Sequence, residues 1–326
     1  MASDTISRIA RGMASGGPAA VHLPSLVVIG TRASKLALAQ TYAIRDALLA
    51  AWPGLEVGVE QITTKGDLIL DRPLSAIGDK GLFVSEIEQA MRERRVDLAV
   101  HSAKDLPSEL PPDMALAALP ARENPLDALV SLRGERLAEL PEGARVGTSS
   151  LRRACQLRAI RPDLRVADLR GNVDTRLRKL REGQYDAIVL AAAGLRRLGL
   201  AGEITELLSP AQMLPAVSQG ALGIEARAGD AELAALLAPL DHPATRLAVT
   251  AERAFLARLG GGCQVPIAAY AQAEGDQIQL GGMVGARDGR VVRGARRGPA
   301  ANPSALGTAL ADELLANGGL ALLQAE

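Results

Sequence analysis

Short apolar runs that each lead into a polar loop and then a helix-like stretch recur along this chain of 326 residues, and this alternation restricts its fold more than any other feature. The first run, residues 26–30, is followed by a loop and by an apolar-periodic stretch over 36–51. We expect a strand, a loop and a helix there, with Ser34 as the helix N-cap. Strand-like, helix-like and again strand-like stretches follow at 57–62, 84–95 and 98–101. This first series predicts a parallel α/β layout.

A second series of the same kind begins near residue 125. Its strand-like and helix-like stretches cover 145–147, 149–160, 164–167, 173–181 and 187–190. The pattern then changes to a long helix, three strand-like pieces and a final helix, over 244–259, 267–271, 277–284, 290–292 and 303–315. We therefore predict an α/β fold, with two similar doubly wound α/β domains around a cleft and a small α+β C-terminal domain.

The composition is that of a folded protein without a membrane span. Hydrophobic residues make up 48% of the chain, and the strongly apolar stretch at 187–195 is far shorter than the roughly 20 residues that cross a bilayer. Two cysteines, Cys155 and Cys263, are too few for a disulfide framework, which favours a reducing compartment. Residues 1–24 lack the apolar core of a secretory signal and are expected to be a disordered tail, so a cytoplasmic location is predicted.

Charge is balanced over the chain but concentrated within it. Acidic and basic residues number 37 each, whereas residues 145–197 hold twelve arginines and one lysine against five acidic residues, a local charge of +8. A polyanion is the expected partner of this segment. Single-stranded nucleic acid would need aromatic side chains for stacking, and Tyr185 is the one aromatic residue in the segment. A small polycarboxylate or polyphosphate fits better, and no nucleic-acid partner is predicted.

Four loops that follow predicted strands carry the candidate binding groups, at 30–34, 102–105, 147–153 and 170–172. Ligands of open α/β sheets bind beyond the carboxyl ends of the strands. All but the last loop combine a hydroxyl with a cation, which suits carboxylate or phosphate. The competing interpretation is that arginine merely replaces lysine in a chain with 32 Arg and 5 Lys. Among the arginines of the helix at 173–181, Arg176 is the best placed to reach a ligand.

Two further features could carry chemistry. Lys104 and Asp105 stand side by side in a predicted crevice loop, where the carboxylate could act as acid or base or stabilise a developing cation; a surface ion pair is the alternative. Cys263 follows three glycines, which predicts an exposed thiol, whereas Cys155 is expected to pack inside a helix face. His101 ends an apolar strand and is expected to be structural, and the three scattered histidines predict no metal site.

Several strings match a known family in the order in which that family carries them. They are residues 30–37 (GTRASKLA), 100–107 (VHSAKDLP), 147–153 (GTSSLRR), 170–176 (RGNVDTR) and 261–266 (GGCQVP). Over residues 26–326 the chain resembles the porphobilinogen deaminase family, also called hydroxymethylbilane synthase.

The resemblance implies a transferase of tetrapyrrole, porphyrin and haem biosynthesis. Such an enzyme condenses four porphobilinogen molecules, releasing ammonia each time, into the linear tetrapyrrole hydroxymethylbilane. The resemblance also implies a dipyrromethane cofactor, two linked pyrroles joined by a thioether to Cys263. Each pyrrole carries acetate and propionate, so the growing product is a polycarboxylate of the kind the +8 segment predicts.

Roles for individual residues follow from the resemblance by motif. Asp105 would be the catalytic carboxylate, stabilising the positive azafulvene left when ammonia departs. The cofactor would be bound by Cys263, Lys104, Asp105, Ser149, Arg152, Arg153 and Arg170. The substrate would be bound by Arg32, Ser34, Ser102, Ser150, Arg176 and Arg197. Lys80 and Phe83 would belong to a mobile loop beside the cleft.

The resemblance also implies a domain layout and a monomer. Domain 1 would cover 25–120 with a return segment at 216–238, domain 2 would cover 124–214, and domain 3 would cover 242–326 and carry the cofactor cysteine. A non-catalytic, two-lobed anion-binding protein is the alternative, since two similar α/β lobes would also suit a solute receptor. An accessible Cys263 argues against that alternative, because a receptor has no use for a thiol there.

Overall fold

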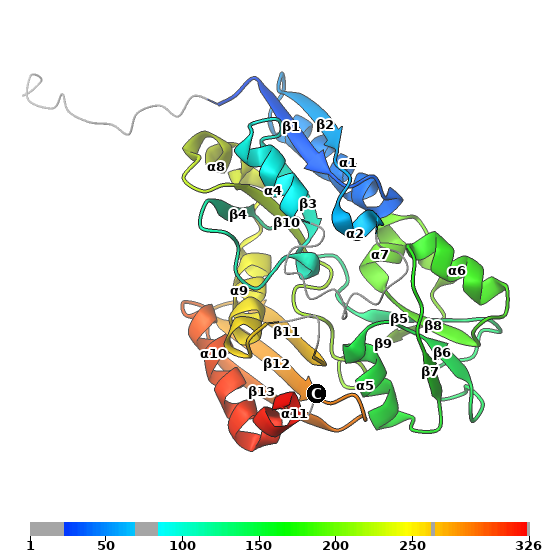
Figure 1. Cartoon of the computed structure of the whole chain (residues 1–326). Helices are drawn as coiled ribbons and strands as arrows, with labels where there is room; N and C mark the ends of the chain where they lie inside the picture. The colour runs from blue at the N-terminus through cyan, green and yellow to red at the C-terminus, as the bar shows by residue number, and fades with distance from the viewer. Residues whose placement is uncertain (1–22, 69–83, 262–264, 325–326) are drawn as a thin grey trace, which may run out of the picture.

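The computed structural model describes residues 23–68, 84–261 and 265–324. Within these ranges the strands form three sheets, two of five strands and one of three. Figure 1 shows the sheet that contains β1 at the top, the sheet that contains β5 at the right, and the three-stranded sheet at the lower left. These are called the first, second and third sheets below.

The first sheet has the strand order β2-β1-β3-β10-β4. Its strands are β1 (Leu26–Thr31), β2 (Glu56–Gln61), β3 (Leu98–Ser102), β4 (Met114–Ala118) and β10 (Leu222–Arg227). Its helices are α1 (Lys35–Ala51), α2 (Lys65–Leu68), α4 (Ser85–Arg92) and α8 (Ala231–Leu237), with a short 3-10 turn, η1 (Ala103–Asp105), after β3. β1 is parallel to β2 and β3, whereas β10 is antiparallel to β3 and β4. The chain therefore leaves this sheet after β4 and returns to it at β10.

The second sheet has the corresponding order β7-β6-β8-β5-β9. Its strands are β5 (Asp127–Ser131), β6 (Arg145–Gly147), β7 (Arg165–Ala167), β8 (Ala187–Ala191) and β9 (Glu206–Leu208). Its helices are α5 (Leu151–Ile160), α6 (Val173–Arg181) and α7 (Ala192–Arg197). β6 is parallel to β7 and β8, and β5 is antiparallel to β8 and β9.

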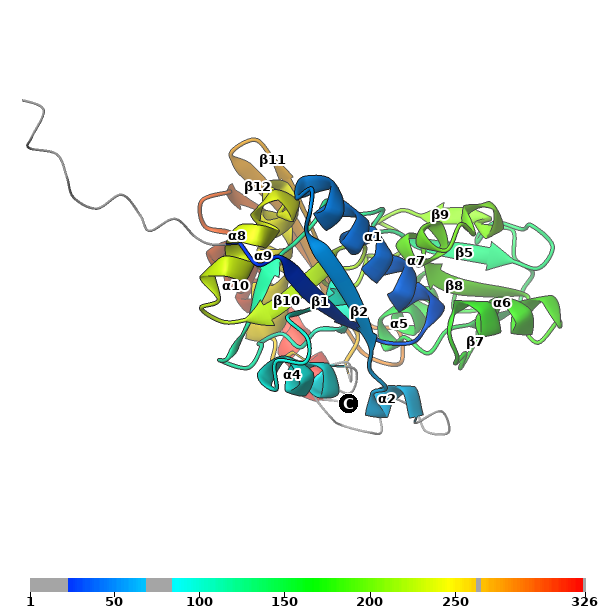
Figure 2. The same cartoon turned by 90° about the horizontal axis from the view of Figure 1, so that it is seen from above.

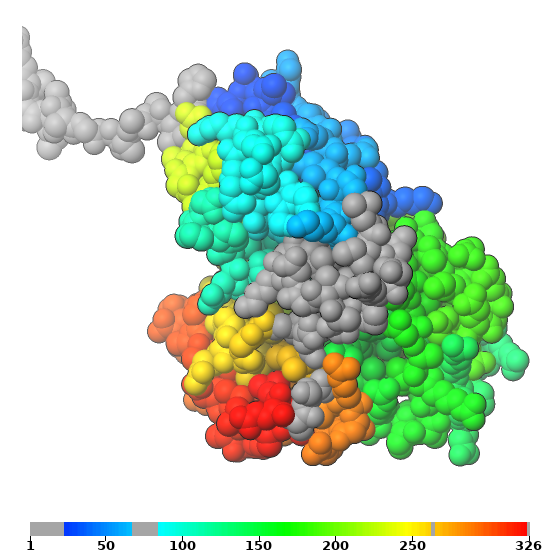
Figure 3. Space-filling model, in the orientation of Figure 1, coloured from blue at the N-terminus to red at the C-terminus, as the bar shows by residue number. Residues whose placement is uncertain are grey.

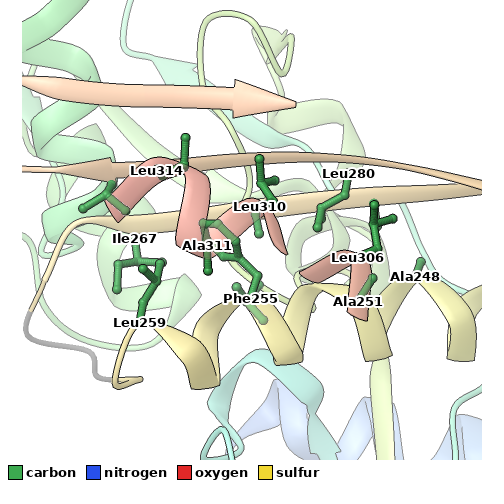
Figure 4. Close-up of a cluster of buried hydrophobic side chains, with 14 of the residues drawn as sticks. Ala248, Ala251, Phe255, Leu259, Ile267, Leu280, Leu306, Leu310, Ala311 and Leu314 are labelled. Carbon is green, nitrogen blue, oxygen red and sulfur yellow. The ribbon is translucent and has the colours of Figure 1, made fainter. Parts of the chain in front are cut away.

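The third sheet is antiparallel and is covered by two long helices. It consists of β11 (Ile267–Glu274), β12 (Gln277–Gly285) and β13 (Val291–Pro299), with α9 (Pro243–Arg258), α10 (Pro303–Leu314) and the short α11 (Leu320–Gln324). Figure 4 shows the core between them, where Phe255 and Leu310 are fully buried. The two helices approach closely at Gly307, because a Cβ there would lie 2.2 Å from the Ala251 carbonyl oxygen.

Helix α1 brings the first two sheets together. It lies beside α7 in the views of Figures 1 and 2, and a Cβ on Gly194 of α7 would contact Leu36 of α1 at 3.6 Å. Lys35 at its first turn forms a 2.8 Å ion pair with Asp174 of α6. The amino end of α1 therefore faces the second sheet.

Most predicted elements are confirmed, including the N-cap of α1, where the Ala37 N–H donates to Ser34 Oγ at 3.3 Å. The parallel layout predicted for the first series is confirmed for β1, β2 and β3, whereas β5 and β10 run antiparallel to both of their neighbours. An apolar run does not by itself reveal the direction of a strand. The strand predicted at 290–292 runs on to Pro299, because exposed arginines and glycines there still pair with β12. The predicted domain boundaries stay a prediction.

Candidate functional site

A pocket at the end of β3 gathers four of the predicted residues. Arg32, Ser34, Ser102 and Asp105 line it together. Arg32 and Ser34 follow β1, while Ser102 and Asp105 come at the end of β3, so the parallel pairing of β1 with β3 brings the two loops together. The loops at 30–34 and 102–105, which lie far apart in the sequence, therefore line the same pocket.

The serine hydroxyls of these loops make local hydrogen bonds. Ser102 Oγ accepts a bond of 2.9 Å from Gln40 Nε2 on α1. In the second sheet, Ser149 Oγ donates to the Leu169 carbonyl at 2.5 Å and accepts from the Leu169 N–H at 3.2 Å, which ties the loop after β6 to the loop after β7. Ser150 Oγ caps α5 by accepting from the Arg153 N–H. These hydrogen bonds stabilise the conformation of the loops that follow β3 and β6.

Arg152 and Arg153 are buried and share one carboxylate, Asp127. Arg152 donates to both Asp127 oxygens, at 2.6 and 3.2 Å, and Arg153 donates to Asp127 Oδ1 from Nε at 2.9 Å and from Nη2 at 2.7 Å. Burial by itself raises the pKa of Asp127, but the two guanidinium groups outweigh it and hold that pKa well below its ordinary value. Asp127 was not among the predicted site residues. An acidic residue opening the apolar run 127–130 was the signal that could have revealed it.

Lys104 of the first sheet reaches the same carboxylate through one glutamine. Its Nζ donates to Gln219 Oε1 at 3.3 Å, and Gln219 Nε2 donates to Asp127 Oδ1 at 3.0 Å. Burial lowers the pKa of Lys104 to about 8; Asp105 and Asp127 raise it, whereas Arg153 and Arg152 lower it further. Gln219 was also missed, since a glutamine in a turn carries no sequence signal of its own.

Arg176 lies within electrostatic range of two other arginines and of Asp105. Burial lowers the pKa of Arg176 to about 10, Arg153 and Arg170 act in the same direction, and Asp105 and Asp168 oppose them. Its Nε donates to the Gly171 carbonyl at 2.7 Å. Asp105 therefore acts electrostatically on Lys104 of its own turn and on Arg176 of the second sheet.

Arg197 lies at the connection between the two sheets. Its Nη2 donates to the Gly220 carbonyl at 2.6 Å, and burial lowers its pKa, which Glu123 opposes. Its contacts are with the connecting segments, next to Gln219.

Cys263, Lys80 and Phe83 lie outside the described residues. The described residue before the cysteine string, Gly261, packs against Ser108, because a Cβ at Gly261 would lie 2.5 Å from Ser108 Oγ. Arg253 of α9 donates to the carbonyls of Pro107 and Ser108 at 2.7 and 3.0 Å. The third sheet's helix α9 is thus fastened to the segment that directly follows Asp105.

Cys155 has the buried placement that was predicted for it, whereas His101 is buried but also lines the pocket at the end of β3. Cys155 is fully buried against Gly285 of β12, and burial raises the pKa of its thiol to about 11. His101 is buried, with Nε2 3.1 Å from Glu225 Oε2. Within the described ranges, no three His, Cys, Asp or Glu residues gather as metal ligands. Among the helices of the same ranges, none is long and apolar enough to cross a membrane.

The mixed sheets and their flanking helices define an α/β protein in which arginines and serines follow the ends of neighbouring strands. The model of the porphobilinogen deaminase dipyrromethane cofactor binding domain matches residues 27–235, and the model of the porphobilinogen deaminase C-terminal domain matches residues 246–316. The chain belongs to the porphobilinogen deaminase family. This confirms the resemblance and disfavours the alternative of a non-catalytic anion-binding protein.

Two curated relatives carry the same family name. The porphobilinogen deaminases of Roseiflexus sp. (strain RS-1) and of Roseiflexus castenholzii (strain DSM 13941 / HLO8) are each 72% identical over 297 residues, which is 91% of this chain and 98% of each relative. Among solved structures, the probable amino-acid ABC transporter extracellular-binding protein ytmK from Bacillus subtilis is 9% identical with a TM-score of 0.41, over 67% of this chain and 90% of that one. That likeness is too slight to support an argument about this chain.

Proposed function

We propose that this protein joins four porphobilinogen molecules, with release of four ammonia molecules and uptake of one water molecule, into hydroxymethylbilane on a dipyrromethane primer. The observation that carries this proposal is the match of both family domains along one chain, together with 72% identity to porphobilinogen deaminases over nearly their full length. The pocket at the end of β3 and the cations of α5 and α6 supply the groups that such a reaction needs.

The residues present fit a dipyrromethane. Arg153 and Arg170 lie close enough to Arg176 to lower its pKa, and the guanidinium groups of all three are donors matched to carboxylates such as the acetate and propionate arms of pyrroles. When bound, the cofactor supplies a pyrrole end that can be extended. We assign its carboxylates to Lys104, Ser149, Arg152, Arg153 and Arg170, and its thioether to Cys263.

Arg152 and Arg153 would bind the cofactor's carboxylates with guanidinium groups that other protein groups already hold in place. Both already donate to Asp127. Arg152 also donates to the Leu214 carbonyl, and Arg153 to the Val189 carbonyl. Guanidinium groups fixed in this way lose little conformational freedom when they bind an anion. Their protein contacts therefore support orientation, and the anion would use the donors that remain.

Asp105 would stabilise the positive charge that develops on the substrate pyrrole as ammonia leaves. Its side chain is exposed at the pocket, next to Lys104 and within electrostatic reach of Arg176. A carboxylate fixed at the place where positive charge appears lowers the barrier more than it would in water. Arg32, Ser34 and Ser102 of the same pocket, with Ser150, Arg176 and Arg197, would hold the substrate's carboxylates.

Several broader features belong to the same proposal. We propose a monomer in the cytoplasm, with domains over 25–120 and 216–238, over 124–214 and over 242–326. The topology supports this division, because β10 completes the first sheet after the chain has formed the second.

Intact-mass spectrometry of the purified protein tests the proposal. We expect a mass above that of the bare polypeptide by two linked pyrrole units, and a colour reaction with an acidic aldehyde reagent. Cys263→Ser should show the bare mass and no turnover of porphobilinogen. Cys155→Ala is the matched control, since its thiol is buried, and should keep the added mass. Unmodified wild-type protein that does not turn over porphobilinogen would contradict the proposal.

A further inference from the structure

Gln219 joins groups from both large sheets with a single side chain. Its Oε1 accepts from Lys104 Nζ at 3.3 Å, and its Nε2 donates to Asp127 Oδ1 at 3.0 Å and to the Pro125 carbonyl at 2.8 Å. The opposite amide orientation would set an oxygen against two acceptors and an NH₂ against an ammonium group. The three contacts therefore determine how this amide points.

The backbone on both sides of Gln219 is held in unusual conformations. Ser218 has φ +61° although it is not glycine, and its N–H donates to the buried carboxylate of Glu252 at 2.6 Å. Gly220 has φ +87°, and a Cβ there would lie 2.3 Å from the Glu123 carbonyl oxygen, so no larger residue fits. Arg122 Nε donates to the Gln219 carbonyl at 2.8 Å. Backbone strain such as that at Ser218 persists where the surroundings enforce it, and it points to a functional constraint.

The carboxylate that Gln219 contacts is the one that orients two arginines. Gln219 and Asp127 are each at most 1% exposed, and Asp127 is the shared acceptor of Arg152 and Arg153. A displacement of the Gln219 amide would therefore reach Lys104 on one side and both guanidinium groups on the other.

We propose that Gln219 is a positioning residue that holds Lys104 in register with Asp127, and through Asp127 with Arg152 and Arg153. This inference rests on the proposed function, because it assigns the alignment of the groups that would bind the cofactor's carboxylates. Gln219 itself touches neither cofactor nor substrate in this role. Its effect on the reaction passes through Lys104 and through the two arginines.

The pH dependence of turnover distinguishes the two roles, because substitution of a merely structural glutamine would leave it unchanged. The charged groups that act on Lys104 are Asp105 on its own turn, Asp127 on β5, and Arg152 and Arg153 on α5. Burial lowers the pKa of Lys104 to about 8 and a cofactor carboxylate beside Nζ would raise it, so the ammonium form is lost as the pH rises through the value that results. Replacing Gln219 by methionine removes the acceptor and should lower this pKa, whereas Gln219→Glu places a carboxylate beside Nζ and should raise it.

The experiment measures kcat and KM for porphobilinogen between pH 6 and 10, with protein of verified cofactor content. Gln219→Met should lower kcat/KM by about 10- to 100-fold through misplacement of the binding groups and should move the alkaline limb to lower pH. Gln219→Glu should move the alkaline limb to higher pH. If Gln219→Met does not fold, the shift in Gln219→Glu alone tests the inference. Gln272→Met, on the exposed side of β11, is the matched control and should behave like wild type.

A double-mutant cycle tests the route through Lys104. In a Lys104→Met background, Gln219→Met should cost less than it does in the wild type, because the partner is already gone. Shifts of the alkaline limb that have the same sign in both Gln219 variants, fully additive losses, or an unchanged profile would overturn the inference. The proposed function fails separately, through a wild-type protein that neither carries a dipyrrole nor consumes porphobilinogen.

Discussion

The first and second sheets have corresponding strand orders, but the charged side chains at the ends of their strands differ in burial. β1 and β6 hold the same place in the two sheets, and each is followed by a helix with a serine N-cap, α1 or α5. The cation that opens α1, Lys35, is 78% exposed, whereas Arg152 and Arg153 of α5 are buried. Equal topology therefore does not imply equal chemistry at the ends of the strands.

The difference lies in the carboxylates. The first sheet presents Asp105 at the surface of a pocket, while the second sheet keeps Asp127 fully buried beneath its arginines. Buried cations need a buried counter-charge, and an exposed carboxylate is free to serve a reaction. Asp127 supports the buried structure of the second sheet, whereas the role proposed for Asp105 is chemical, and substitution of each residue should separate the two roles.

The largest effect is expected at Asp105. Asp105→Asn removes the negative charge that we propose stabilises the developing cation, and it should lower kcat by about 10²- to 10³-fold. Its exposed position predicts a free energy of unfolding within about 0.5 kcal/mol of wild type. Steady-state kinetics and urea denaturation of the same preparation check both parts. A variant that loses stability along with turnover would break the comparison.

Asp127→Asn should act on stability first. It removes the negative charge that Arg152 and Arg153 share and leaves them one neutral acceptor oxygen, and removing a partner from a buried ion pair costs about 3–5 kcal/mol. Urea denaturation measures the loss, with the exposed Asp46→Asn as the control. An Asp127→Asn variant as stable as that control would contradict the structural role.

The acid dependence of stability sharpens the same test. The pKa of Asp127 is depressed in the folded protein, so its stabilisation is complete above its ordinary pKa of about 3.9 and is lost as the pH falls through the folded-state value. The free energy of unfolding of wild type should therefore fall more steeply below about pH 4 than that of Asp127→Asn.

The smallest effect is expected at the exposed ion pair between the two sheets. Lys35 and Asp174 are 78% and 43% exposed at their side chains, so their coupling energy should lie between about 0.2 and 1 kcal/mol and shrink with added salt. A double-mutant cycle with Lys35→Met and Asp174→Asn measures it. A coupling above that range would mean that α1 and α6 are joined more firmly than their exposure predicts.

Four lining residues of the pocket at the end of β3 could be predicted from local sequence. Arg32, Ser34, Ser102 and Asp105 each follow a recognisable strand, and the parallel pairing of β1 with β3 brings them to one pocket. Asp127 and Gln219 were missed because their partners are distant in the sequence. Gln219 is 115 positions from Lys104 and 92 positions from Asp127. Periodicity and loop composition report neighbours along the chain, so they cannot show such pairs.

The sequence by itself determined the succession of strands, loops and helices and the family strings they carry, because these depend on local periodicity and on the residue types at each turn. The tertiary structure alone decided the antiparallel insertion of β5 and β10 and the pairing of Arg152 and Arg153 with Asp127. A charge is neutralised by whichever group shares its buried surroundings, and only the packing of distant segments determines which group that is.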